Sequence, residues 1–218
     1  MGTFLFDFDG TLVDSMPTYI SAMLRILNEN NISYGDDIIK IITPLGINGA
    51  AEYYINNLGL KKSKEELIDL MKAYMKEEYF NTVPPKENVI PVLKELKNRG
   101  DSLNVLTASP HLTLDACLKR LEIYDLFDNV WSCDDFNTTK ADPDIYVMVA
   151  KKLNKKVDEI WFLDDNLGAD TTAKSAGMKV CGVYDESSED YTEEIKAITD
   201  HYIYNFSELL DLQSWENK

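Results

Sequence analysis

The stretch that decides the fold of this chain is Phe4-Leu5-Phe6-Asp7-Phe8-Asp9-Gly10-Thr11-Leu12-Val13-Asp14-Ser15. It begins as a short apolar strand and ends in two carboxylates, Asp7 and Asp9, after which Gly10 predicts a turn. Two acidic groups at the end of a strand suit hydrolytic or metal chemistry, because one can attack or ligate while the other moves protons. The alternative is a solvated loop that happens to carry two aspartates.

Composition limits the classes of protein to consider. The 218 residues are 44% hydrophobic and 28% charged, which is typical of a soluble globular protein. The sequence contains no apolar run of about 18 residues and no signal-type segment near Met1, so we expect a cytoplasmic protein. Three isolated cysteines without metal spacing are expected to be buried free thiols in a reducing compartment.

The chain is strongly acidic. Its net charge is -16, from 38 acidic and 22 basic residues. This charge argues against nucleic acid or an anionic membrane as a partner. An anionic substrate must therefore be attracted locally, by a cation or by a few well-placed donors.

Hydrophobic periodicity divides the chain into two parts. Apolar positions recur at helical spacing in residues 16 to 30, 47 to 58 and 63 to 80. After Pro84-Pro85 the pattern becomes alternating strands and helices. The strands expected there are residues 104 to 107, 129 to 132, 159 to 163, 179 to 183 and, weakly, 202 to 204. The helices expected there are residues 89 to 99, 111 to 121, 142 to 153, 168 to 176 and 207 to 212.

This alternation predicts an α/β fold, with a Rossmann-like three-layer core around a mostly parallel sheet. The strand before Gly10 must join the same sheet, so residues 1 to 14 and 85 to 218 form the predicted core domain. Residues 15 to 84 are then an inserted α-helical cap domain. An insertion at the carboxyl end of a strand lies above the crevice where open α/β sheets bind ligands.

Further polar residues follow the other predicted strands. Thr107 and Ser109 end one strand, and Asp164 and Asp165 end a later one, while Lys140 lies in a loop between them. Each residue alone would be read as a turn, cap or surface residue. Their joint order is more informative, because all of them can meet at one edge of the sheet.

The order and surroundings of these residues resemble the four motifs of the haloacid dehalogenase-like superfamily, in the branch with a small helical cap that includes phosphoglycolate phosphatases and β-phosphoglucomutases. The matching segments are Phe6 to Ser15, Leu106-Thr107-Ala108-Ser109, Lys140-Ala141-Asp142-Pro143, and Leu163-Asp164-Asp165-Asn166 leading to Ala176-Gly177. The sequence departs from the common pattern at three positions: Ala108, Ala141 and Asp164.

The resemblance implies a magnesium site formed by Asp7, the backbone carbonyl of Asp9, and Asp165. It leaves open whether Asp164 or Asp170 adds another carboxylate. Asp7 would be the nucleophile that forms an aspartyl-phosphate, and Asp9 the general acid and base. The resemblance also implies that the transferred phosphoryl group is held by Thr107, Ala108, Ser109 and Lys140.

The cap is expected to set substrate choice. The stretch Pro44 to Gly49 is the predicted substrate-facing loop, with Gly46 and Asn48 as contact residues, because glycines permit close approach. A plain connection between two helices is the competing interpretation of the same residues.

The function expected from the resemblance is magnesium-dependent hydrolysis of a small phosphomonoester, of the phosphoglycolate or sugar-phosphate type. A β-phosphoglucomutase-like phosphosugar mutase uses the same motifs and is the nearest alternative. A dehalogenase fits less well, because Asp9 would have no task in displacing halide. A catalytically retired phosphate-binding protein is the non-enzyme alternative. The expected partner is a small phosphorylated metabolite, with no obligate protein partner.

Overall fold

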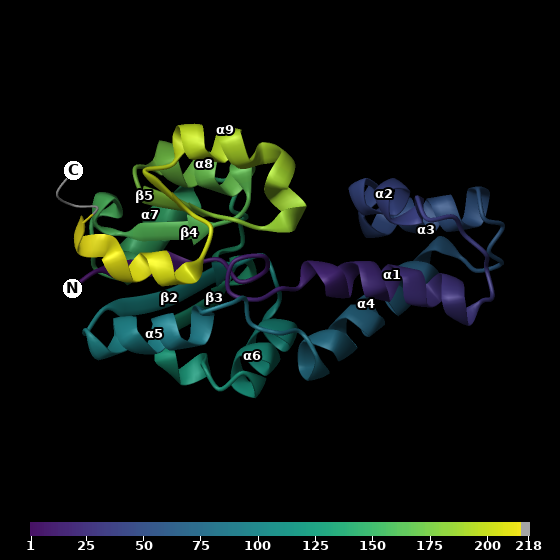
Figure 1. Ribbon diagram of the computed structural model, residues 1–218, viewed down its shortest axis with the longest axis horizontal. Helices are drawn as coiled ribbons and strands as arrows, with labels where there is room; N and C mark the ends of the chain where they lie inside the picture. Colours follow the sequence, from purple (N-terminus) through teal and green to yellow (C-terminus); the bar gives the residue numbers. More distant parts are fainter. Residues whose placement is uncertain (215–218) are drawn as a thin grey trace. The chain divides into compact units, whose positions relative to one another are not determined.

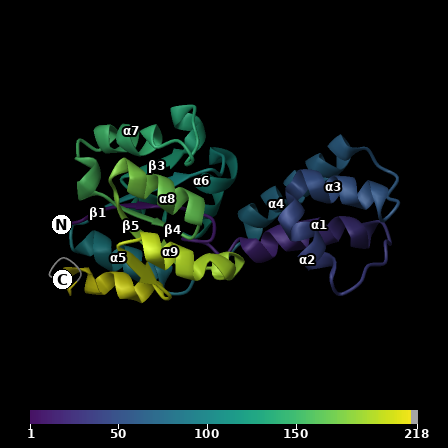
Figure 2. The ribbon, with the colours of Figure 1, turned by 90° about the horizontal axis from the view of Figure 1, so that it is seen from above.

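The computed structural model describes residues 1–214, which form two compact units. The core unit contains residues 1–14 and the chain from Pro84 onward, and the helical unit is Ser15–Val83. Figures 1 and 2 show the strands gathered in the core unit and only helices in the other. No helix within the described residues combines the length and the hydrophobicity needed to cross a membrane.

The core unit is built on a parallel sheet of six strands within the described residues, in the order β3-β2-β1-β4-β5-β6. The strands are β1 (Thr3–Phe6), β2 (Ser102–Thr107), β3 (Asn129–Ser132), β4 (Trp161–Asp164), β5 (Lys179–Val183) and β6 (His201–Ile203). The chain moves to one side after β1 and to the other side after β3, so the strand order reverses between β1 and β4. Parallel sheets place their ligand crevice at the carboxyl ends of the strands at such a reversal.

Helices cover both faces of this sheet (Figure 1). They are α5 (Val89–Asn98), α6 (His111–Arg120), α7 (Asp144–Lys152), α8 (Leu167–Ala176) and α9 (Thr192–Ile198). Leu5 and Phe162 of the sheet pack with buried residues of α7 and α8 on one face. Phe6 meets Phe127 and Phe206 on the other. The predicted fold class, a three-layer α/β core with an α-helical insertion, is confirmed.

The helical unit has its own hydrophobic core. Its helices are α1 (Met16–Glu29), α2 (Ile38–Ile42), α3 (Gly46–Asn56) and α4 (Lys64–Asn81), with a 3₁₀ turn η1 (Thr43–Leu45). The hydroxyl of buried Tyr54 donates to the Met23 carbonyl oxygen at 3.1 Å and joins α3 to α1. The Ser63 hydroxyl accepts the Glu66 backbone N–H at 3.1 Å and caps the start of α4.

The structure corrects several sequence-based expectations. The stretch Pro44 to Gly49 is expected to be a substrate-facing loop, although the helical spacing of residues 47 to 58 overlaps it. Helix α3 begins at Gly46, so Gly46 and Asn48 both lie in its first turn. Helices α2 and α9 were not predicted, because five and seven residues are too few to show a helical period. The predicted helix at 207 to 212 is a 3₁₀ helix, η6 (Phe206–Ser214).

The two chain segments at the boundary between the units pair with each other inside the core unit. Val13 and Pro85 form an antiparallel bridge, and the Asp14 N–H donates to the Pro84 carbonyl oxygen at 3.0 Å. The Lys86 N–H donates to the Leu12 carbonyl oxygen at the same distance. The segment that returns from the helical unit is therefore hydrogen-bonded to the segment that follows the Asp7–Asp9 pair.

Candidate active site

Asp7 is positioned by the sheet itself. Phe6 is in register with Leu163, and the Asp7 N–H extends this pairing by donating to the Leu163 carbonyl oxygen at 2.8 Å. The side chain of Asp7 therefore lies at the carboxyl end of β1, beside the point where Asp164 ends β4. Both aspartates are buried, with exposed fractions of 5% and 0%, so their charges are largely shielded from water.

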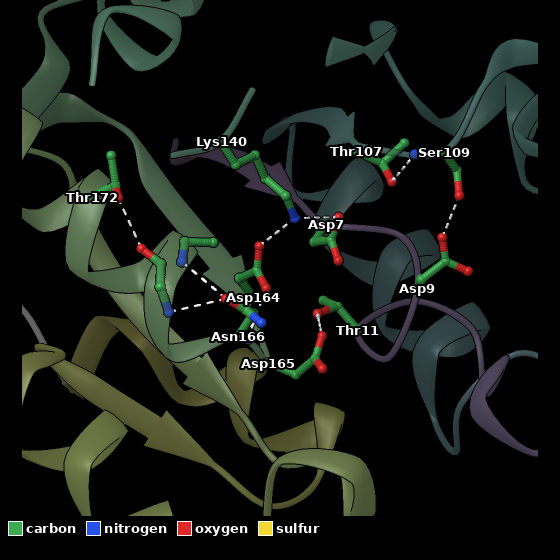
Figure 3. A network of polar contacts seen from close by, with 12 residues as sticks. Asp7, Asp9, Thr11, Thr107, Ser109, Lys140, Asp164, Asp165, Asn166 and Thr172 are labelled. Carbon is green, nitrogen blue, oxygen red and sulfur yellow. Dashed lines mark hydrogen bonds and ion pairs between the residues drawn. The ribbon is translucent and has the colours of Figure 1, made fainter. Parts of the chain in front are cut away.

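Lys140 reaches both aspartates from the loop before α7. Its Nζ lies 2.7 Å from Asp7 Oδ1 and 2.6 Å from Asp164 Oδ2 (Figure 3). The backbone of Lys140 is anchored in turn, because the Tyr146 hydroxyl lies 3.1 Å from both the Lys140 and the Ala169 carbonyl oxygens. A buried ammonium is thus shared between two buried carboxylates, which favours its charged form over the neutral amine.

Burial and mutual repulsion control the ionisation of this group. Burial raises the pKa of Asp7 to about 7; Lys140 opposes this rise, while Asp164 and Asp9 add to it. Burial and the charges of Asp164 and Asp7 also raise the pKa of Asp165. Burial alone would lower the pKa of Lys140, but Asp164 and Asp7 raise it well above its usual range. The site therefore holds more negative charge than Lys140 can offset, and it favours an additional cation.

Asp165 lies against the turn that follows β1. The Thr11 hydroxyl donates to Asp165 Oδ1 at 3.1 Å (Figure 3). Gly10 has a φ of +79°, and a Cβ added there would lie 2.5 Å from Asp165 Oδ2. Glycine is therefore required at position 10, both for the left-handed backbone and for the close approach of a carboxylate. The role of Thr11 was not predicted, although the residue belongs to the quoted motif.

Asp9 lies on the other side of this turn and is held by the segment after β2. The Ser109 hydroxyl donates to Asp9 Oδ2 at 2.5 Å, and the Ser109 N–H donates to Thr107 Oγ1 at 3.0 Å (Figure 3). Thr107 is buried at the end of β2, while the neighbouring Ala108 is exposed. The segment from Thr107 to Ser109 thus connects directly to the second carboxylate of the motif.

The chemistry of the donor set fits a hard divalent cation. One carboxylate oxygen from each of Asp7, Asp164 and Asp165 lies within 4.8 Å of the others, and magnesium prefers oxygen ligands of this kind. Asp170 is not part of this cluster. It is fully buried in α8, and neither of its carboxylate oxygens has a hydrogen-bond partner within residues 1–214.

The two oxygens of Asp164 are already engaged within the protein. Oδ2 faces Lys140, and Oδ1 accepts the Asn166 N–H at 2.8 Å. Asp7 and Asp165 are less occupied by such contacts. Asp164 is therefore occupied by Lys140 and Asn166, whereas Asp7 and Asp165 have more free capacity to ligate a cation.

The core-unit residues singled out from the sequence form two groups that flank the Gly10 turn. Asp7, Lys140, Asp164 and Asp165 lie on one side, and Asp9, Thr107 and Ser109 on the other. Gly46 and Asn48 belong to the separate helical unit.

Comparison with known proteins agrees with this arrangement. Residues 4–183 match the haloacid dehalogenase-like hydrolase family, so the chain belongs to that family and is an enzyme of the hydrolase class. The family resemblance predicted from the motifs is confirmed.

The relatives named next have sequence identities to this chain of 29% or less. The chain is 29% identical over 182 residues to pyrophosphatase PpaX of Bacillus velezensis, which covers 82% of this chain and 81% of the relative. It is 25% identical to a phosphorylated carbohydrates phosphatase of Thermotoga maritima, over 82% of this chain and 83% of the relative. A crystal structure from Thermotoga maritima, provisionally named β-phosphoglucomutase, has the same fold with a TM-score of 0.84. At 23% identity, that match covers 98% of this chain and 99% of the other.

Proposed function

We propose that this chain is a magnesium-dependent phosphatase that hydrolyses a small phosphorylated metabolite through an aspartyl-phosphate intermediate. The observation that carries the proposal is the buried Asp7 carboxylate. It is one of the three clustered carboxylates, lies 2.7 Å from the Lys140 ammonium, and stands two residues before Asp9. A nucleophile, a neutralising cation and a second carboxylate are thus grouped at the carboxyl end of β1.

Asp7 and Asp165 would hold the magnesium ion, together with the Asp9 carbonyl oxygen named from the resemblance. When bound, the ion would offset the repulsion between the Asp7 carboxylate and a phosphate dianion and polarise the phosphoryl oxygens. Asp164 would not ligate the ion directly but would hold Lys140 in position. We assign no ligand role to Asp170.

The protein's own groups carry the two chemical steps. In the first, an oxygen of ionised Asp7 forms a bond to phosphorus, the bond to the leaving oxygen breaks, and Asp9 donates a proton to that oxygen. In the second, Asp9 takes a proton from a water molecule that attacks phosphorus. This step releases inorganic phosphate and returns the Asp7 carboxylate.

Lys140, Thr107 and Ser109 support these steps. The Lys140 ammonium would offset charge on the transferred oxygens, while the Thr107 hydroxyl and the backbone amides of Ala108 and Ser109 would donate to them. The Ser109 hydroxyl already donates to Asp9 and would fix the orientation of the acid. The proposed location is the cytoplasm, because the buried free thiols of Cys117, Cys133 and Cys181 suit a reducing compartment.

The names of the relatives guide the choice of substrates. They include a pyrophosphatase and a phosphatase of phosphorylated carbohydrates, so the test panel contains pyrophosphate, sugar phosphates, phosphoglycolate, nucleotides and pyridoxal phosphate. We expect phosphate release that requires magnesium, stops with EDTA and disappears in Asp7→Asn. Full activity in the presence of chelator, or an Asp7→Asn variant as active as the wild type, would contradict the proposal.

A phosphosugar mutase remains the second candidate, since a structure that shares this fold carries that provisional name. Phosphorus NMR of the products separates the two functions. Hydrolysis gives inorganic phosphate, while a mutase gives an isomeric sugar phosphate with little free phosphate.

A further inference from the structure

Lys86 makes an unusual set of contacts for a lysine in an acidic protein. Its side chain is only 19% exposed. Nζ donates to the Gly10 carbonyl oxygen at 2.7 Å, the Tyr184 carbonyl oxygen at 2.5 Å and Asp185 Oδ2 at 2.9 Å. An ammonium group has three N–H donors, so these three acceptors use all of them. Lys86 has no donor left for a substrate, and its effect must be exerted on the protein.

The three acceptors come from two loops that flank Asp165. Gly10 follows β1, while Tyr184 and Asp185 follow β5, and β4 lies between these two strands in the sheet. Asp165 follows β4 directly. Lys86 therefore connects the loops on either side of the carboxylate that would bind the cation.

Each end of this connection also has contacts of its own. Asp185 is 5% exposed and accepts the Ser187 N–H and hydroxyl, while the Tyr184 N–H donates to the Ile203 carbonyl oxygen at 2.9 Å. The Gly10 turn is closed by its own backbone hydrogen bonds, from the Gly10 N–H to the Val13 carbonyl oxygen and from the Leu12 N–H to the Phe8 carbonyl oxygen, both at 2.9 Å. These bonds close the turn on itself, whereas Lys86 joins it to the loop that follows β5.

We infer that Lys86 is a positioning residue that fixes the Gly10 turn against Asp165 and neutralises Asp185 beside it. This inference rests on the proposed function for its catalytic consequence. The turn lies between Asp9 and Thr11 in the sequence. Its position therefore determines where the proposed acid, Asp9, lies and where the Thr11 hydroxyl donates to Asp165. Loss of the ammonium would release the turn from the loop after β5 and leave the buried Asp185 carboxylate without its cation, next to the proposed metal site.

The test compares Lys86→Met with Lys97→Met, which removes a half-exposed lysine paired with Asp128, a residue just before the amino end of β3. The first readout is hydrogen exchange of the peptide spanning residues 6 to 14, measured without metal. The second is the magnesium dependence, kcat and KM for a small aryl phosphate.

We expect faster exchange in Lys86→Met, with kcat reduced about 10- to 100-fold, a higher magnesium requirement and little change in KM. Lys97→Met should match the wild type in every readout. Exchange and kcat that match those of Lys97→Met would overturn the inference.

Lys86→Arg covers the case in which Lys86→Met does not fold. A guanidinium keeps the positive charge opposite Asp185, but its planar fork cannot direct three donors to acceptors grouped around one nitrogen. We expect a near-wild-type melting temperature with faster exchange of the 6-to-14 peptide and a lower kcat. Wild-type exchange in this variant would refute the positioning role.

The two proposals fail in different ways. A wild-type protein that releases phosphate from no substrate would remove the proposed function. The exchange measurements would still decide whether Lys86 holds the Gly10 turn.

Discussion

Replacing Asp7 with asparagine is expected to remove activity and, at the same time, to stabilise the metal-free protein. The wild-type carboxylate is 5% exposed and lies near Asp164 and Asp9, so ionising it is unfavourable in the folded state. An asparagine amide has nearly the same shape and can still accept a hydrogen bond from Lys140. The substitution therefore removes a buried charge without opening a cavity.

The magnitude follows from the pKa of Asp7. Its rise from 3.8 to about 7 makes the folded state hold a proton that the unfolded state releases, so the unfolding free energy of the wild type falls as pH increases through this window. The stability gain of Asp7→Asn should be near zero around pH 4 and grow by about 1.4 kcal/mol per pH unit. It should level off near pH 7 at a ceiling of about 4 kcal/mol.

Urea unfolding in EDTA, followed by tryptophan fluorescence at several pH values, measures this gain. The helical unit, Ser15–Val83, contains no tryptophan, so the signal comes from the rest of the chain, whose three tryptophans are Trp131, Trp161 and Trp215. Asp128→Asn is a matched control, because Asp128 pairs with Lys97 at an exposed position. An Asp7→Asn variant that is no more stable than wild type at pH 8, or whose gain is independent of pH, would refute the reasoning.

Four further substitutions test neighbouring parts of the site. Gly10→Ala should lower both activity and melting temperature, since the new Cβ would lie 2.5 Å from Asp165 Oδ2; an unchanged melting temperature would argue against this crowding. Asp165→Ala should raise the magnesium requirement about 10- to 100-fold, whereas Asp164→Ala should chiefly lower the melting temperature. If magnesium titrations show the larger effect for Asp164→Ala, then Asp164 and not Asp165 is the ligand. Asp9→Asn should reduce kcat about 10²- to 10⁴-fold, and a loss below about tenfold would exclude it as the acid.

The fold was largely predictable because its signals are local and repeated. Strands β2, β3 and β4 each end in a polar residue, and each helix of ten or so residues shows an apolar face. The elements that escaped prediction are short or lack this contrast. The α2 helix, Ile38–Ile42, is apolar at four of five positions and has no polar face to mark it. A glycine next to Pro44-Leu45 is typical of a loop, but Gly46, which has a positive φ, is the first residue of α3.

The candidate site was predictable where the motif residues follow strands, and not where contacts depend on tertiary structure. Asp7 and Asp164 face each other because their strands are neighbours, which the strand order implies. Lys86 gave no such signal, since a lysine after two prolines in an acidic chain is ordinarily a solvated residue. Its three acceptors lie 76, 98 and 99 residues away along the chain, so only the folded structure brings them together.

The charge at this sheet edge connects stability to the proposed chemistry. Asp7, Asp164 and Asp165 are clustered around one ammonium in a chain of net charge -16. Without a cation, this cluster both destabilises the fold and repels a phosphate dianion. A divalent ion on Asp7 and Asp165 would relieve both effects, because the same carboxylates cause them. The free energy of metal binding would then appear partly as protein stability and partly as affinity for the anionic substrate. Binding of the cation and binding of the substrate would therefore be thermodynamically coupled.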